Sequence, residues 1–256
     1  MLFRSEASRE IGTSGAADAG ARGTRDFLVT AQNRATGEQE HFCAGVLINS
    51  AGLFADEIGR MAGAGDYTLH PCRGEYHILD KKCARDLAAS IAATAANRAD
   101  KGPAASSPLS GALEFPIYPI PNEREGGLGV HLTPAIHGNI LIGPSAEYLA
   151  KEQEPEDYST TQAVMDRLRE EGAGLFPGLD VRNCIRSFSG IRPKLVSEEE
   201  GGYADFVVEE SRQVPGFIQL IGIESPGLTA SIPIAQMVKR MVEEIKGRGG
   251  EDRGTG

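Results

Sequence analysis

Short apolar runs separated by polar turns recur along most of the chain and predict strands. The run "CAGVLINSAG" is almost continuously apolar, which predicts a strand buried on both faces. Three consecutive runs joined by short turns, between residues 114 and 148, predict an antiparallel meander. The predicted strands lie within residues 26–33, 43–52, 73–80, 114–122, 127–136, 139–148, 184–195, 203–211 and 216–225.

Helical spacing of apolar positions is confined to a few segments, namely residues 53–63, residues 159–176 and the stretch from Gly227 to Ile245. An Ala-rich helix beginning at Cys83 and ending in a Pro/Ser/Gly loop predicts a surface excursion over residues 83–111. Residues 1–25 have little hydrophobic pattern and are predicted to be a disordered or non-native start, and residues 247–256 a polar tail. The mixture of helices and strands predicts an α/β or α+β fold.

Charge and cysteine content exclude several classes of partner. The formal net charge of −10 argues against nucleic acid or an anionic membrane as the main partner, because both require a basic surface. No apolar run reaches the roughly 18 residues of a membrane-spanning helix. Four cysteines are present, but their spacing suits neither zinc nor an iron–sulfur cluster, so we predict no metal site and a reducing cytoplasmic location.

Two turns between a strand and a helix could bring backbone close to a ligand. Gly227, Leu228 and Thr229 open the last helix, where N–H groups and the helix dipole favour negative charge and a missing Cβ leaves room. Ala51 and Gly52 follow a buried strand in the same manner. The alternative is that these small residues only make the turns, and the turns alone favour that alternative.

Three basic side chains are candidates for handling a substrate. Arg192 in "GIRPKL" and Arg73 in "PCRGEY" could each present a planar fork to a carboxylate or phosphate, or could form structural ion pairs. His131 in "GVHLTP" could act as a general base, or could simply be hydrogen-bonded within its strand. The sequence contains no HExxH, GxSxG or P-loop motif, which disfavours zinc proteases, serine hydrolases and phosphoryl transferases.

Five blocks in order carry a resemblance to a known family. They are "VLINSAGLFADEIGRMAG", "PCRGEYHILD", "GLGVHLTPAIHGNILIGPSAEY", "FSGIRPKL" and "GIESPGLTASIPIAQMV". Together they resemble the FAD-dependent oxidoreductases of the D-amino-acid oxidase superfamily, in the branch of the glycerol-3-phosphate dehydrogenases and L-2-hydroxyglutarate dehydrogenases or oxidases. The resemblance covers about residues 26–244.

The resemblance implies FAD as cofactor and a two-part architecture. Residues 26–70 and 185–246 would be the remainder of a Rossmann-like FAD-binding domain, and residues 71–184 an antiparallel-sheet substrate domain. The cofactor would lie against positions in three of the matching blocks, namely Ala51, Gly52, Gly190, Gly227, Leu228 and Thr229.

The resemblance also implies roles in catalysis. Arg192 would pair with an anionic oxygen of a small 2-hydroxy acid or of glycerol 3-phosphate, with Arg73 as a further candidate. His131 would take the hydroxyl proton while a hydride moves to the flavin. The acceptor that later removes the electrons from the flavin is left open.

One departure from the family concerns the unit that holds the FAD pyrophosphate. The family begins with a strand, a GxGxxG turn and a helix, and "REIGTSGAADAG" has neither the preceding strand nor the spacing. Two hypotheses therefore stay open: a flavoenzyme or the larger part of one, or a non-catalytic substrate domain that binds a ligand or partner without holding FAD tightly. Because the strand Gly45–Asn49 would lack the parallel neighbours that the ADP-binding unit supplies, we expect it to expose an apolar face and to favour self-association, poor solubility or a partner that supplies that unit.

Overall fold

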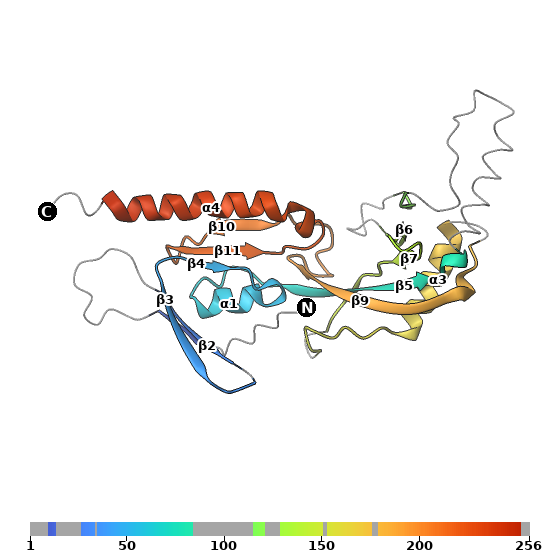
Figure 1. The fold of residues 1–256 in the computed structure, drawn as a ribbon, viewed down its shortest axis with the longest axis horizontal. Coiled ribbons are helices and arrows are strands. Elements are labelled where there is room, and N and C mark those ends of the chain that lie inside the picture. The colour runs from blue at the N-terminus through green and yellow to red at the C-terminus, as the bar shows by residue number, and fades with distance from the viewer. Residues whose placement is uncertain are drawn as a thin grey trace, which may run out of the picture. The chain divides into compact units, whose positions relative to one another are not determined.

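The computed structural model describes residues 10–13, 27–33, 35–83, 115–120, 129–150, 153–175 and 179–251. The chain divides into two compact units (Figure 1). The first unit comprises the chain up to His70, the short segment Arg192–Leu195 and everything from Ala204 onward. The second comprises Pro71–Ile191 and Val196–Tyr203, so the chain passes between the units more than once.

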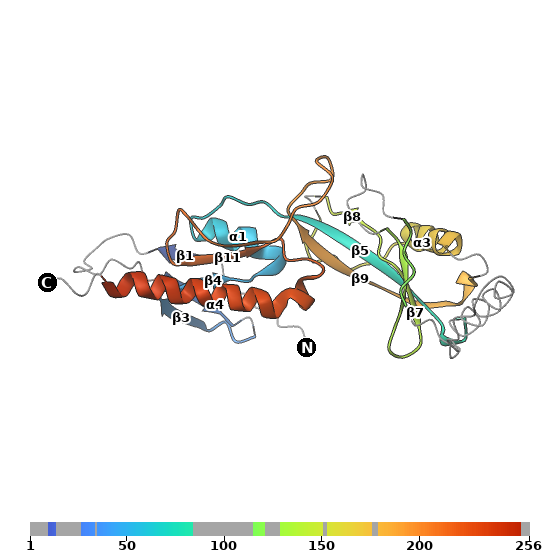
Figure 2. The ribbon, with the colours of Figure 1, turned by 90° about the horizontal axis from the view of Figure 1, so that it is seen from above.

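A three-stranded sheet in the order β10–β11–β4 forms the centre of the first unit. β4 and β11 run parallel, and β10 is antiparallel to β11. The strands lie between helices α4 and α1 (Figures 1 and 2). On β11, Phe217 and Ile221 are fully buried: Phe217 clusters with Ala62, which directly follows α1, and Ile221 clusters with Ala55 of α1. The elements are β4 (Leu47–Asn49), η1 (Gly52–Phe54), α1 (Ala55–Met61), β10 (Val207–Glu210), β11 (Phe217–Ile221) and α4 (Gly227–Glu251).

β4 is a short strand at the end of this sheet. Among the described strands it pairs only with β11. Its central residue, Ile48, is 43% exposed: its side chain points to the face away from α1, and on that face α4 contacts mainly β10. An accessible apolar residue on such a strand is consistent with the expected self-association, which stays a prediction.

A second, antiparallel sheet in the order β1–β2–β3 also belongs to the first unit. Phe27 opens β2 and is almost fully buried, with its ring centroid 6.1 Å from that of Phe217. This aromatic contact anchors the hairpin β2–β3 to the core beneath α1. The strands are β1 (Glu10–Thr13), β2 (Phe27–Gln32) and β3 (Gln39–Ala44).

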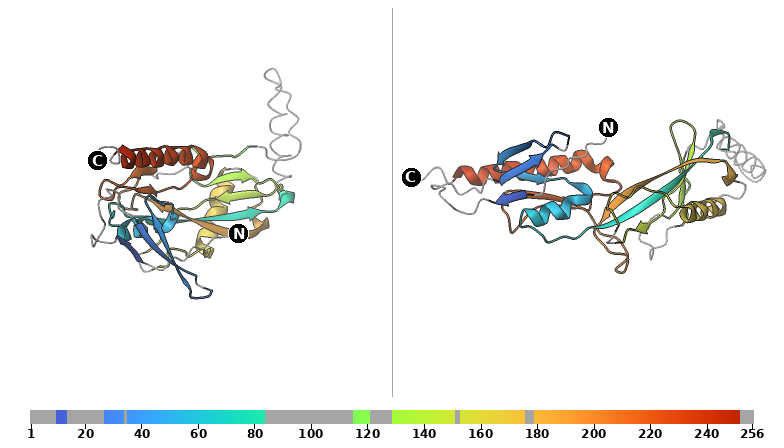
Figure 3. Two further views of the ribbon diagram at one scale, coloured as in Figure 1. Left: turned by 60° about the vertical axis from the view of Figure 1, so that its left-hand side comes forward. Right: turned by 90° about the horizontal axis from the view of Figure 1, so that it is seen from below.

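The second unit is built on an antiparallel sheet in the order β6–β7–β5–β8, with β9 also paired to β5. Helix α3 packs along one side of this sheet (Figures 2 and 3). Val164, Met165 and Leu168 of α3 are buried against Leu132 and Ile142 of the sheet. The elements are β5 (His70–Leu79), β6 (His131–Pro134), β7 (Ile140–Gly143), β8 (Glu147–Tyr148), α3 (Gln162–Leu175), η4 (Val181–Asn183) and β9 (Cys184–Lys194).

The strand register separates the two faces of this sheet. Leu79 is opposite Ile140, and Leu132 is opposite Ile142, and these buried residues face α3. Residues of the other parity lie on the opposite face, because side chains alternate along a strand. We call this second face the open face, because no described helix covers it; its members are Tyr76, Ile78, His131, Thr133, Leu141 and Gly143.

The mixed fold class predicted from the sequence is confirmed, but three local expectations are wrong. Residues 10–13, expected to be structureless, form β1, because pairing with β2 satisfies their backbone groups without a hydrophobic pattern. The strand expected over residues 43–52 breaks at Gly45, where the chain leaves the β2–β3 hairpin to pair with β11. Residues 247–251, expected in a polar tail, extend α4, and Arg248 there pairs with Glu210 of β10.

The boundary of the second unit also differs from the expected one. Residues 185–191 were expected in the FAD-binding domain, but they belong to the second unit because β9 pairs with β5 of its sheet. Residues 196–203 join the second unit as well, and the hydroxyl of Tyr148 donates to the carbonyl of Val196 at 3.1 Å. The expected excursion at residues 83–111 and most of the expected start lie outside the described residues.

Candidate cofactor and substrate sites

Two turns meet at one edge of the sheet in the first unit. β4 and β11 are parallel and in register from Leu47 opposite Phe217 to Asn49 opposite Gln219, so their carboxyl ends lie at the same edge. The segments that follow these strands contain five of the predicted cofactor residues: Ala51, Gly52, Gly227, Leu228 and Thr229. The carboxyl edge of parallel strands is where open α/β sheets bind ligands.

The turn after β4 is fixed by a buried side chain. Asn49 is 2% exposed; its amide donates to the carbonyl of Ala55 at 2.7 Å, and its carbonyl oxygen accepts from the N–H of Ala51 at 3.3 Å. Gly52 has φ +61, and a Cβ placed there would meet nothing within 4 Å. The glycine backbone is therefore exposed and open to a ligand, while Asn49 holds its position.

The start of α4 exposes both backbone donors and an apolar side chain. Gly227 is buried, and a Cβ there would lie 2.6 Å from Cγ2 of Ile223, so only glycine fits. Leu228 is 92% exposed, and Thr229 is also exposed. The N–H groups of Leu228 and Thr229 belong to the first helical turn, which carries the positive end of the helix dipole. A flat ligand with an apolar body and acceptor atoms at its rim suits this surface.

His131 lies on the open face of the second unit, directly opposite Gly143 on β7. Its Nδ1 is 2.9 Å from the carbonyl oxygen of Gly129, and its ring stacks on Tyr118 with centroids 4.3 Å apart. On the far side of Gly143, Tyr76 stacks on Phe188 at 4.9 Å and 3°. Aromatic pairs therefore lie on both sides of Gly143, and a Cβ there would come within 2.8 Å of the ring of Tyr76.

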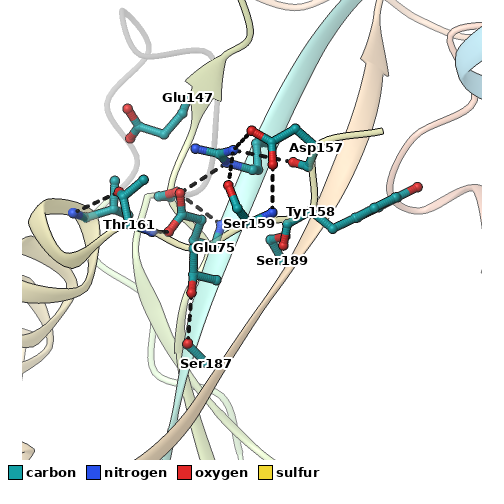
Figure 4. A network of polar contacts seen from close by, with 12 residues as sticks. Glu75, Glu147, Asp157, Tyr158, Ser159, Thr161, Ser187 and Ser189 are labelled. Atoms are coloured by element: carbon teal, nitrogen blue, oxygen red, sulfur yellow. Dashed lines mark hydrogen bonds and ion pairs between the residues drawn. The ribbon is translucent and has the colours of Figure 1, made fainter. Parts of the chain in front are cut away.

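Arg73 is buried on the α3 side of the sheet, in the network shown in Figure 4. Its Nε donates to Glu75 at 3.1 Å, and one terminal nitrogen donates to the carboxylate of Asp157 at 2.8 Å and to the hydroxyl of Ser159 at 3.1 Å. Glu75 is fully buried and also accepts from the N–H of Thr161 at 2.8 Å. The network fastens the segment before α3 to β5.

The same segment is joined to β9. The hydroxyl of Ser189 donates to the carbonyl of Tyr158 at 2.7 Å, and the hydroxyls of Thr160 and Ser187 are 3.0 Å apart. The side chain of Tyr158 points away from the network (Figure 4) and is 47% exposed. Hydrogen bonds from Ser159, followed by the charge of Arg73, hold the pKa of the Asp157 carboxyl below its usual range.

These contacts support the structural alternative for Arg73. Its guanidinium pairs with two carboxylates, its side chain is only 7% exposed, and it lies on the face opposite His131.

Two other predicted residues, Gly190 and Arg192, follow Phe188 at intervals of two on β9. Gly190 is exposed, and a Cβ placed there would meet nothing within 4 Å, whereas Arg192 is half buried. Gly190 belongs to the second unit and Arg192 to the first, and their roles stay predictions.

Two further titratable groups are perturbed for structural reasons. Burial lowers the pKa of His77, which is 5% exposed and whose Nε2 lacks a partner among the described residues. Burial, and then the hydrogen bond to Glu209 at 2.7 Å, raise the pKa of Tyr67 to about 12.

Within the described ranges, no cluster of three His, Cys, Asp or Glu side chains could hold a metal ion. No helix in the part of the chain that the structure describes is long and apolar enough to cross a membrane.

Comparison with known proteins places the chain in a family. Residues 13–241 match the DAO family, FAD dependent oxidoreductase, so the chain belongs to that family of FAD-dependent enzymes. It is 30% identical over 199 residues to glycerol 3-phosphate dehydrogenase of Caloramator mitchellensis, covering 78% of this chain and 34% of that protein. It is 38% identical over 130 residues to the mitochondrial L-2-hydroxyglutarate dehydrogenase of Arabidopsis thaliana, covering 48% of this chain and 26% of that protein.

Solved structures show the same fold. The FAD-bound L-alpha-glycerophosphate oxidase of Mycoplasma pneumoniae superposes with a TM-score of 0.58 at 24% identity, over 85% of this chain and 47% of that one. The glycerol-3-phosphate dehydrogenase of Bacillus halodurans complexed with FAD gives 0.54 at 17% identity, over 92% of this chain and 38% of that one. The chain thus spans less than half the length of these relatives.

The described residues fit the ring end of FAD. The open backbone at Gly52 and the helix start at Leu228 and Thr229 match a flat ring with hydrogen-bond acceptors at its rim. The sequence singled out these turns by their small residues, and their role in holding FAD, which came from the family resemblance, stays a prediction. Sequence reasoning missed Tyr118, Gly129 and Gly143 around His131, because only the cross-strand register shows that they are neighbours.

Proposed function

We propose that the chain provides the flavin-ring and substrate-handling residues of an enzyme that oxidises a small 2-hydroxy acid or glycerol 3-phosphate. Membership of the FAD-dependent family supports the reaction class, and the names of the relatives suggest the substrates. The observation that carries the proposal is His131 on the open face, beside glycine and aromatic residues and away from the carboxylate network.

Each part of the reaction has a candidate group. The residues that follow β4 and β11 would hold FAD, which would supply the acceptor for the hydride that leaves the substrate carbon. His131 takes the proton of the substrate hydroxyl, so that the C–H bond breaks with its electron pair and the C=O bond forms. Arg192 offers a planar cation to the substrate carboxylate or phosphate. Arg73 takes no part in this scheme, because Glu75 and Asp157 already neutralise it.

The experiment is anaerobic reduction of FAD by the purified 256-residue chain. FAD is supplied in large excess, because the sequence holds no GxGxxG turn and we expect binding weak enough to be lost on dialysis. Glycerol 3-phosphate or L-2-hydroxyglutarate is then added, and loss of the visible flavin absorption is followed. One of the two should bleach the flavin.

Two histidine variants make the test specific. His131→Asn should bind FAD as the parent chain does but reduce it about 100-fold more slowly, the usual contribution of a general base. His137→Asn, in the exposed turn between β6 and β7, should behave as the parent. Equal rates for parent and His131→Asn would remove His131 from the reaction. Failure to bind FAD at any concentration would favour the alternative, a substrate domain that holds no cofactor.

A further inference from the structure

Tyr118 lies on one side of the His131 ring and is held there by backbone pairing. Its neighbour Ile117 exchanges two hydrogen bonds of 2.9 Å with Leu132, the residue after His131. This isolated bridge places the segment 115–120 beside β6, and the Tyr118 and His131 rings stack at 29°. Stacking of this kind restricts rotation of the imidazole about its side-chain bonds.

Gly129 supplies the hydrogen-bond partner of the ring. Its carbonyl oxygen lies 2.9 Å from Nδ1 of His131, two residues further along the chain. Gly129 has φ +69, and a Cβ there would lie 3.0 Å from Cγ of Pro119. The backbone conformation that aims this carbonyl therefore favours glycine, and Pro119 packs against the same turn.

The chemistry of the carbonyl decides which ring nitrogen carries the hydrogen. A carbonyl oxygen only accepts hydrogen bonds, so Nδ1 must donate. In the neutral ring, Nε2 then has a lone pair and no hydrogen. Within the described residues, no hydrogen bond to Nε2 of His131 is seen. The arrangement leaves Nε2 able to accept a proton.

We propose that Tyr118 and Gly129 are positioning residues that hold His131 in the tautomer protonated at Nδ1, with Nε2 available as a proton acceptor. The inference rests on the proposed role of His131 in substrate oxidation. Tyr118 fixes the plane of the ring and Gly129 fixes the tautomer, and neither needs to contact the substrate. The proposal does not depend on whether the cofactor is bound.

The test is nitrogen NMR of the full chain labelled with 15N in its 5 histidines, at mildly alkaline pH and without flavin. The His131 signals are assigned by their loss in His131→Gln. Chemical shifts distinguish a protonated ring nitrogen from one with a lone pair, so they give the ratio of the two tautomers. We expect the Nδ1–H form of His131 to dominate by about fivefold or more.

Variants of Tyr118 separate positioning from general stability. Tyr118→Phe keeps the stacked ring and should keep the tautomer ratio, whereas Tyr118→Ala should reduce it several-fold. Tyr203→Ala, at a tyrosine of the second unit that is 65% exposed, is the matched control and should change nothing. If Tyr118→Ala does not fold, Tyr118→Leu, which fills more of the space without an aromatic ring, takes its place.

Three results would overturn the proposal: a dominant Nε2–H form in the parent chain, an unchanged ratio when the Tyr118 ring is removed, or a loss in Tyr118→Phe equal to that of the ring-deleting variant. None of them depends on flavin or substrate. A failure here therefore leaves the proposed oxidation intact, and a failure of flavin reduction leaves the tautomer result intact.

Discussion

Replacing Glu75 by Gln should strongly destabilise the second unit, because Glu75 is fully buried and pairs with the buried Arg73. Removing one partner of a buried ion pair costs about 3–5 kcal/mol, since the other charge is left buried and uncompensated. Arg73 would keep Asp157 at 2.8 Å, so we expect the lower end, about 3 kcal/mol. The double variant Arg73→Met/Glu75→Leu should cost less than the two single changes combined, because no buried charge is left alone; Asp157, which also loses Arg73, has a side chain that is 31% exposed.

Urea unfolding followed by far-UV circular dichroism measures these costs; the chain contains no tryptophan to report by fluorescence. Arg167→Gln is the matched control: Arg167 pairs with Glu147, but the two side chains are 47% and 31% exposed, so the loss should stay below about 1 kcal/mol. A cost for Glu75→Gln no larger than that of Arg167→Gln would refute the reasoning. It would also reopen Arg73 as a residue that faces substrate.

Three further predictions concern other parts of the chain. Burial lowers the pKa of His77 in the folded state, so the contribution of His77 to stability is present above the ordinary histidine pKa of about 6.5 and is lost as the pH falls below that value. Unfolding measured at several pH values should show this loss in the parent chain and not in His77→Gln. Arg192→Lys keeps the charge but loses the planar fork of the guanidinium, so the transition-state stabilisation calculated from kcat/KM should fall by roughly 2–3 kcal/mol with unchanged flavin content. A lower Tm with normal kinetics would instead identify Arg192 as a partner in a structural ion pair. Gly59→Ala would bring a Cβ to 2.8 Å from Oε1 of Gln219 and 2.9 Å from the carbonyl of Ala64, and should cost about 1–3 kcal/mol in a denaturation experiment.

The sequence was sufficient for the family, the fold class and the cofactor, and these are confirmed. The resemblance was specific because five blocks, from "VLINSAGLFADEIGRMAG" to "GIESPGLTASIPIAQMV", occur together in the family's order, whereas no single block would have identified the family. His131 could be located by its place in an apolar strand, although its role stays a prediction. The cytoplasmic location also stays a prediction.

The rest depended on contacts between distant residues. Arg73 and Asp157 lie on segments far apart in the sequence, and no local pattern shows that a carboxylate will reach the guanidinium. In the extension of α4, Arg248 pairs with Glu210 of β10, and the strand at residues 10–13 pairs with one edge of β2. Side chains and edges of this kind are supplied by tertiary structure, which single-sequence periodicity does not encode.

The way in which the two units share the chain affects the order of folding during synthesis. The second unit draws its sheet and α3 from the largely continuous stretch Pro71–Ile191, so nearly all its strands have left the ribosome long before the C-terminus. Among the described strands, Leu47–Asn49 of β4 has its parallel partner at Phe217–Gln219, so the described part of this sheet is complete only once β11 has emerged. Domains usually fold in N- to C-terminal order on the ribosome. We therefore expect the second unit to form first, with β4 lacking its described partner until β11 has been made, and a pause late in translation to prolong that exposure.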